Sequence, residues 1–525
     1  MRAMLVLMSV VMAAPAFAAP DEQDDAATMA AQMAAGRTSS EAITRAALAR
    51  IAAMDRKGPT LRAVIAVNPD ALAQARAADA RRRAGASLGT LDGIPVLVKD
   101  NIETKDPMAT TAGSLALAAN VTGRDAPVVA LLRGKGAVIL GKTNLSEWAN
   151  IRSTASISGW SAVGGQVKNP YALDRTPCGS SSGSGAGVAA GYAPLALGTE
   201  TDGSVVCPAS INGLVGLKPT LGLVSRTHVV PISHSQDTPG PMARSVRDVA
   251  VMLGAMVGTD AADPATRDAD SHRVDYAAGL AGASLQGVRI AVLRPTMGAP
   301  LAQRFDAALA VLRAQGAVLV PVEKPKLEGL GEAEHVVLRT ELKADLNAYL
   351  AGAAPGVTVR SLADVIAFDD KESAREMPYF GQESFLDAQS AKGLEDAEYR
   401  GMLAKSRRLA GTEGIDAMLQ AAQATLLVEP TYGPGWLIDP VYGDGFDGPS
   451  ASQLPAVSGY PHLTVPMGLA RGLPVGLSFI ARPYGEAGLL GAGYVYEQAS
   501  HVRRAPLYLP QADVGPGQEG VARIP

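Results

Sequence analysis

One glycine-rich segment, residues 178–204, concentrates hydroxyl side chains that could act as nucleophiles. It reads CGSSSGSGAGVAAGYAPLALGTETDGS and holds seven serine and threonine residues. A flexible linker would not contain the apolar run 188–197. The segment also lacks the third glycine of a dinucleotide fingerprint, and the chain has no GxxxxGK[ST] phosphate loop. The segment therefore favours a catalytic loop over a linker or a nucleotide-binding loop.

Within this segment, residues 179–183 satisfy the G-x-S-x-G pattern of an α/β-hydrolase, with Ser181 as the nucleophile. That pattern needs a strand immediately before it, but residues 168–177 contain two prolines and several turn formers. The triad would also need a histidine, and none of the six histidines lies in a distinctive motif. An α/β-hydrolase-type esterase is therefore the weaker interpretation.

Lys99 is an unusual basic residue because it ends the apolar run 93–98. Lysine is rarely buried. It could extend toward solvent and pair with Asp100 or Glu103, or burial could lower its pKa so that a neutral amine serves as a general base. These residues alone leave both readings open.

Short apolar strands that alternate with helices would position these residues. Strands are expected at 94–98, 137–140, 214–217, 288–293, 318–322, 425–428, 463–465 and 475–480, and helices at 39–54, 69–83, 127–133, 246–256 and 302–314. Asn68 is the expected N-cap of the second helix, with Pro69 at its first position. The alternation predicts an α/β fold with a mixed, largely parallel central sheet covered by helices on both faces.

The organisation of the chain is that of one large domain. Residues 332–422 are mainly helical in pattern, which predicts an insertion beside the sheet, and no linker separates two parts. The 525 residues include 47 Lys plus Arg and 51 Asp plus Glu, for a net charge of -4. This balance argues against a nucleic-acid binder. No HExxH pair is present to bind zinc, and we expect neither a metal nor an organic cofactor.

The first 18 residues have the pattern of a secretory signal peptide. Arg2 precedes an apolar run, and Ala16-Phe17-Ala18 forms a small-x-small cleavage site. We expect cleavage near Ala18, a mature chain 19–525 without a membrane span, and a periplasmic or secreted location. Export would permit a disulfide between Cys178 and Cys207, but two cysteines are too few for a disulfide scaffold, so reduced, packed thiols are the favoured reading.

Several ordered motifs together resemble the amidase signature family of serine hydrolases, over about residues 41–504. They are GIPVLVKDN (93–101), GKTNLSEWA (141–149), CGSSSGSGAG (178–187), GTETDGS (198–204), GLVGLKPT (213–220) and PMGLARGLPVGLSF (466–479). Within the family, GTETDGSVVCPAS (198–210) and VVPISHSQDTPGPMARS (229–245) resemble most the peptide amidases, which remove the C-terminal amide of peptides.

The resemblance implies a Ser-cisSer-Lys triad. Ser204 matches the nucleophile, Ser180 the relay serine held on a cis peptide bond, and Lys99 the general base, which leaves Ser181 as a supporting hydroxyl. An oxyanion hole is expected from the backbone N–H groups of Thr201, Asp202, Gly203 and Ser204. The chain departs from the commonest family pattern at Cys178, Ser182, Glu200, Asp202 and Val206.

Asp202 stands where glycine is usual in the family, and its carboxylate would either contact substrate or cap a helix. The reaction implied is hydrolysis of a carboxamide to a free acid and ammonia through an acyl-serine, with C-terminal peptide amides as substrates. The alternatives are a generic aliphatic or aromatic amidase, one component of a tRNA amidotransferase, and a non-catalytic exported peptide-binding protein. We expect a monomer whose partner is a small-molecule or short peptide amide.

Overall fold

The computed structural model describes residues 21–512. The predicted signal peptide, residues 1–18, lies outside the described residues. Within residues 21–512 no helix combines the length and the apolar composition that crossing a membrane requires.

The described residues contain one eleven-stranded sheet, with the strand order β1-β3-β2-β4-β6-β5-β10-β11-β9-β7-β8. The strands are β1 (Val64–Val67), β2 (Pro95–Lys99), β3 (Val138–Thr143), β4 (Leu195–Glu200), β5 (Val215–Lys218), β6 (Thr238–Ala243), β7 (Arg289–Leu293), β8 (Val318–Val322), β9 (Leu426–Pro430), β10 (His462–Ala470) and β11 (Leu473–Ile480). Because these strands form a single sheet, the chain is one α/β domain, as the sequence predicts.

The sheet is mixed, but the expectation that it is largely parallel is wrong. Six of the ten strand pairs in residues 21–512 are antiparallel and four are parallel. The physical reason is clearest at β10 and β11, which only Arg471 and Gly472 separate. So short a connection can join only antiparallel neighbours. The parallel pairs β2–β3, β2–β4, β7–β8 and β7–β9 lie toward the two ends of the sheet.

Helices cover both faces of the sheet, as predicted. Successive residues of β2 show the alternation, since Val96 and Val98 pack in one buried cluster and Leu97 packs in another. The cluster of Val96 includes residues of α1 (Ala26–Ala34), α4 (Pro127–Gly134), α7 (Val246–Met256), α8 (Ala299–Ala314) and α16 (Glu486–Ser500). The cluster of Leu97 includes residues of α2 (Ser40–Met54), α3 (Ala71–Arg83), α5 (Ser182–Ala189) and α6 (Val206–Ile211).

The start of α3 differs from the prediction. The helix begins at Ala71, with Asp70 as its N-cap residue, rather than at Pro69. Asn68 instead accepts a hydrogen bond from the backbone N–H of Asp70 at 2.9 Å, and its side-chain amide donates to the carbonyl of Ile139 at 2.7 Å. Asn68 therefore shapes the turn before the helix and ties that turn to β3.

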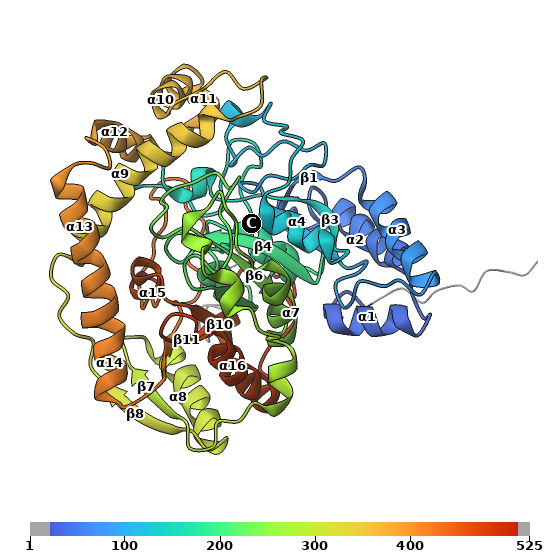
Figure 1. Ribbon diagram of the computed structural model, residues 1–525, viewed down its shortest axis with the longest axis vertical. Coiled ribbons are helices and arrows are strands. Elements are labelled where there is room, and N and C mark those ends of the chain that lie inside the picture. The colour runs from blue at the N-terminus through green and yellow to red at the C-terminus, as the bar shows by residue number, and fades with distance from the viewer. Residues whose placement is uncertain (1–20, 513–525) are drawn as a thin grey trace, which may run out of the picture.

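The segment predicted as a helical insertion forms a series of helices beside the sheet. They are α9 (Leu330–Ala351), α10 (Leu362–Lys371), α11 (Ser373–Glu376), α12 (Glu383–Ser390), α13 (Ala397–Arg407) and α14 (Ala417–Ala421), with a π-helical stretch at Arg408–Asp416. In Figure 1 they form an arc along one side of the molecule, from α10 and α11 at the top to α14 at the lower left. These helices thus lie beside the sheet, and the sheet itself is continuous.

Candidate active site

Lys99 lies at the carboxyl end of β2, and its side chain is completely buried. Its Nζ donates to Ser180 Oγ at 2.7 Å, to Thr199 Oγ1 at 2.8 Å and to the Thr199 carbonyl at 3.1 Å. The Asn101 side-chain amide also donates to Thr199 Oγ1, at 2.9 Å. The structure therefore brings the predicted base and the predicted relay serine into direct contact, across 81 positions of sequence.

The alternative in which Lys99 pairs with Asp100 or Glu103 is wrong. Asp100 pairs with the buried Lys142 at 3.2 Å, and Glu103 pairs with Arg124. Lys99 forms no salt bridge within the described part of the chain. Burial lowers its pKa to about 7, an effect that the carboxylates of Asp237 and Glu200 partly oppose. A substantial share of neutral amine therefore exists near neutral pH.

The loop that carries Ser180 lies against the segment of Ser204. The peptide bond between Gly179 and Ser180 is cis, as the resemblance implies. The backbone N–H of Ser181 donates to the carbonyl of Ser204 at 3.2 Å. Ser181 Oγ donates to the Thr199 carbonyl at 3.1 Å and accepts from the Thr199 N–H at 3.2 Å. The Ser181 hydroxyl thus has the supporting role that the resemblance predicts.

Ser204 lies just before helix α6 and is 7% exposed. Its hydroxyl makes no hydrogen bond to another side chain within residues 21–512, and the hydrogen bond that joins the two serine segments is the one from the Ser181 N–H to the Ser204 carbonyl. Catalytic hydrogen bonds are often long before substrate binds. Gly203 has a φ of +80°, and a Cβ at this position would come within 2.3 Å of the Tyr432 hydroxyl. Glycine is therefore required at this turn.

The backbone before Ser204 offers free hydrogen-bond donors. Among the described residues, the N–H groups of Thr201, Asp202, Gly203 and Ser204 donate to no protein acceptor. The next two N–H groups, of Val205 and Val206, donate to the Glu200 carboxylate at 2.8 and 2.9 Å. Four consecutive N–H groups are thus free to bind an anion, and the Glu200 carboxylate holds the next two in place. An oxyanion hole needs a turn of this kind.

The two cysteines are joined, so the expectation of reduced, packed thiols is wrong. Cys178 and Cys207 form a disulfide with a Cα–Cα distance of 6.0 Å. The reason is the fold itself, because the cis-peptide loop packs on the first turn of α6 and brings the two Cα atoms into bridging range. The disulfide joins the residue two positions before Ser180 to the residue three positions after Ser204.

All six histidines lie within the described residues, and none of them takes part in this site. His462 is buried against Ser478 Oγ at 2.6 Å, and His272 stacks on Tyr484. His335 pairs with Asp387 at 2.9 Å, and His228 lies near Glu103. His501 ends helix α16, and His234 pairs with Asp345 at 2.9 Å. The α/β-hydrolase alternative is therefore excluded, because Ser181 and Ser204 have no histidine partner.

The residues next to the nucleophile turn, 201–204, were not among the predicted site residues. Thr201 Oγ1 donates to Asp237 at 2.6 Å, and the Gln236 amide donates to the Thr201 carbonyl at 3.2 Å. On the other side, the hydroxyls of Tyr432 and Ser452 lie 2.7 Å apart. Asp237 and Gln236 belong to the motif at 229–245, which was a signal for them. Tyr432 and Ser452 lie in no recognisable motif.

The insertion attaches to the same region through Glu341 of α9. Its carboxylate accepts hydrogen bonds from Ser233, Ser235 and Tyr399. His234, Glu341 and Asp345 have ligand atoms within 4.8 Å of one another. Because these groups already pair with one another and with hydroxyls, they are explained as a polar network that holds the 229–237 loop against α9.

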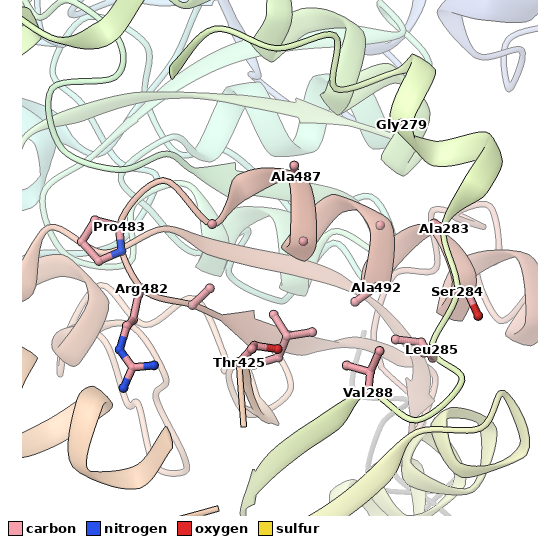
Figure 2. A pocket seen from close by; sticks show the side chains of 15 residues that line it. Gly279, Ala283, Ser284, Leu285, Val288, Thr425, Arg482, Pro483, Ala487 and Ala492 are labelled. Atoms are coloured by element: carbon pink, nitrogen blue, oxygen red, sulfur yellow. The ribbon is translucent and has the colours of Figure 1, made fainter. Parts of the chain in front are cut away.

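A separate cavity of about 490 Å³ lies beside helix α16, and Figure 2 shows the side chains that line it. Its lining consists of glycines, alanines and other small or apolar residues together with Arg482, Ser284 and Thr425. Among the described residues that line it, there is no acid, histidine, lysine or cysteine that could serve as a base or nucleophile. The chemistry therefore belongs to the Lys99 site and not to this cavity.

Comparison with known proteins supports this assignment. The family model described as Amidase matches residues 42–490. A probable amidase of Arabidopsis thaliana is 40% identical over 87% of this chain and 86% of its own length. A glutamyl-tRNA(Gln) amidotransferase component of Halorhodospira halophila is 38% identical over 91% of this chain and 97% of its own length. The native peptide amidase of Stenotrophomonas maltophilia superposes with a TM-score of 0.87 and 50% identity, over 92% of this chain and 98% of that one. The chain thus belongs to the amidase signature family and is an amidase, a hydrolase of linear amides.

Proposed function

We propose that this amidase removes the C-terminal carboxamide of peptides through an acyl-enzyme on Ser204. The observation that carries the catalytic part is the buried Lys99 side chain, whose Nζ lies 2.7 Å from Ser180 Oγ and whose pKa is lowered to about 7. A neutral lysine next to a serine is a base and relay of the kind that activates a serine nucleophile.

The proposed reaction conserves every proton. Neutral Lys99 takes the proton of Ser180 while Ser180 takes the proton of Ser204, whose Oγ bonds to the amide carbonyl carbon. The carbonyl oxygen becomes an oxyanion held by the free N–H groups of residues 201–204, each worth about 3–4 kcal/mol in comparable sites. The proton returns through Ser180 to the departing nitrogen, and ammonia leaves. Water then hydrolyses the ester, which releases the acid and restores Ser204.

Similarity to a peptide amidase supports peptide amides as the substrates. The S. maltophilia enzyme is described as a peptide amidase, and a structure of a related peptide amidase, 51% identical to this chain, contains the competitive inhibitor chymostatin. The amidotransferase component is less similar, at 38% identity. We therefore assign peptide amides as the substrate class.

A substrate panel tests this assignment. Ammonia release should be measured from amidated dipeptides, simple aliphatic amides and aromatic amides under the same conditions. We expect kcat/KM to be at least about tenfold higher for the amidated peptides. Contacts between the enzyme and a peptide chain can lower the activation barrier of hydrolysis, and simple amides have no peptide chain to make these contacts. Equal values across the panel would replace the assignment with a generic amidase.

We also propose that the enzyme works outside the cytoplasm as a monomer. The signal-peptide pattern at residues 1–18 and the disulfide between Cys178 and Cys207 support export, since disulfides persist in oxidising compartments. Expression of the full chain in a bacterial host should give a periplasmic protein whose N-terminus is Ala19. A protein that keeps Met1 and remains in the cytosolic fraction would refute the proposal. Light scattering of the purified protein tests the monomer.

A further inference from the structure

The carboxylate of Asp202 belongs to the nucleophile turn, residues 201–204, and the mechanism does not use it. Its Oδ1 is buried and has no hydrogen-bond partner within residues 21–512. The residue as a whole is partly exposed, as is Thr201, whereas Gly203 and Ser204 are buried. A buried acceptor without a partner is costly, which suggests that a ligand completes it.

The groups around Asp202 are already engaged with one another. Ser452 makes hydrogen-bond contacts with the hydroxyls of Tyr432 at 2.7 Å and Ser450 at 3.1 Å. The Glu334 carboxylate accepts from the Gln236 amide at 3.0 Å and from the Gln453 amide at 2.9 Å. Both oxygens of Glu334 therefore accept hydrogen bonds, whereas Oδ1 of Asp202 is buried and has no partner within residues 21–512.

The charged groups around Asp202 are consistent with its carboxylate accepting a hydrogen bond from the substrate. Burial raises its pKa, while the nearby Ser452 hydroxyl and the buried Lys218 ammonium act in the opposite direction. Glu334 is a second carboxyl next to it, and burial together with Asp202 raises the pKa of Glu334 to about 7. A donor N–H that reaches Oδ1 would therefore be favoured in this acidic surrounding.

The position of Asp202 indicates which donor this is. It lies two residues before the nucleophile, in the turn whose N–H groups face the carbonyl oxygen of the proposed substrate. In an amino-acid carboxamide, the α-nitrogen is separated from the scissile carbonyl carbon by only the α-carbon. A carboxylate in this turn would therefore lie near an N–H on that nitrogen once the carbonyl is bound, whereas simple aliphatic amides have no donor there.

We infer that Asp202 is a specificity-determining residue whose Oδ1 accepts a hydrogen bond from the α-nitrogen of the residue that bears the carboxamide. The donor is either the peptide N–H of an amidated peptide or the α-ammonium of a free amino-acid amide. This inference rests on the proposed function and names the group that lets the enzyme distinguish a peptide amide from a simple one. A site built to pair with an N–H discriminates strongly against analogues that lack it.

Four substrates test the inference. They are N-acetylalaninamide, its α-N-methyl derivative, the ester analogue with oxygen in place of that N–H, and alaninamide with its free α-ammonium. In the unmodified enzyme, kcat/KM for N-acetylalaninamide should exceed that for the methyl and ester analogues by about ten- to a hundredfold, the effect of one hydrogen bond to a charged group. Comparing kcat/KM for alaninamide and N-acetylalaninamide shows whether the free α-ammonium or the peptide N–H is the better donor.

The variant Asp202→Gly restores the residue that is usual in the family and should reduce this ratio to below about threefold. Because the ratio compares substrates within one variant, a general loss of rate does not affect it. Asp202→Asn keeps an acceptor oxygen and should give an intermediate ratio, which serves if the glycine variant does not fold. Glu334→Gln is the matched control for the second carboxyl and should keep the ratio.

Three results would overturn the assignment. They are an unchanged ratio in both Asp202 variants, no discrimination by the unmodified enzyme, and an equal fall of the ratio in Glu334→Gln, which would indicate charge rather than a hydrogen bond. These differ from failure of the proposed function, in which the unmodified enzyme would release no ammonia from any amidated peptide.

Discussion

Replacing Ser204 with alanine should abolish ammonia release from an amidated dipeptide, with a loss in kcat of about 10⁴-fold or more. The reason is that the acyl-enzyme forms on its Oγ, and neither Ser180 nor Ser181 can take its place. Ser180 Oγ accepts a hydrogen bond from Lys99 Nζ at 2.7 Å, and Ser181 Oγ bonds the backbone of Thr199. A coupled assay for ammonia under single-turnover and steady-state conditions measures the effect.

Ser181→Ala is the matched control, because it removes a neighbouring hydroxyl of the same segment. It removes a hydrogen bond and no nucleophile, so we expect a much smaller loss of activity than in Ser204→Ala. The thermal stability of the Ser204 variant should be close to that of the unmodified protein, which shows that the loss is chemical. If Ser181→Ala were inactive and Ser204→Ala active, the nucleophile would be Ser181 and the triad wrong.

Lys99→Ala and Lys99→Arg should each lower kcat/KM by about 10²- to 10⁴-fold, the usual contribution of a general base. Arginine keeps the positive charge but does not release a proton at neutral pH, so it should not rescue the alanine variant. A purely structural lysine would instead be replaced by arginine with little effect on the rate. Retention of activity within tenfold in Lys99→Arg would contradict the role of a base.

The pH profile of the unmodified enzyme provides the second measurement for Lys99. Burial lowers the pKa of Lys99 to about 7, and only the neutral amine can accept a proton. We therefore expect kcat/KM to fall as pH drops through about 7 and to reach a plateau above it. In the Lys99 variants the remaining activity should lose this dependence. A base with an unshifted pKa would place the rise near pH 10.

The fold was predictable where strand and helix patterns are unambiguous, and the exceptions have physical causes. Apolar runs identified β2 and helix α7 within one or two residues. Strand β6 was missed because its sequence, TPGPMA, has two prolines and a glycine. Its prolines are tolerated because Pro239 and Pro241 pair only with β4, while β5 reaches only Met242 and Ala243.

The candidate site was predictable only in part for the same reason. The sequence motifs identified Lys99, Ser180 and Ser204, because the spacing of the motif residues and their glycine content can be read directly from the sequence. The contacts of Tyr432 and Ser452 depend on a loop that the fold returns to the nucleophile turn from more than 200 residues away. A hydroxyl in an ordinary loop has no pattern of its own, so sequence analysis does not single out such residues.

The disulfide between Cys178 and Cys207 makes residues 178–207 a covalently closed ring that contains both reacting serines. Lys99 lies outside this ring, on β2, and contacts Ser180 within it. For protein engineering, this ring sets the length of residues 178–207, whereas segments outside it can change in length. The helices between β8 and β9 lie outside this ring. Circular permutation and domain fusion should therefore be designed in the surface connections outside 178–207, where ring closure does not constrain the chain.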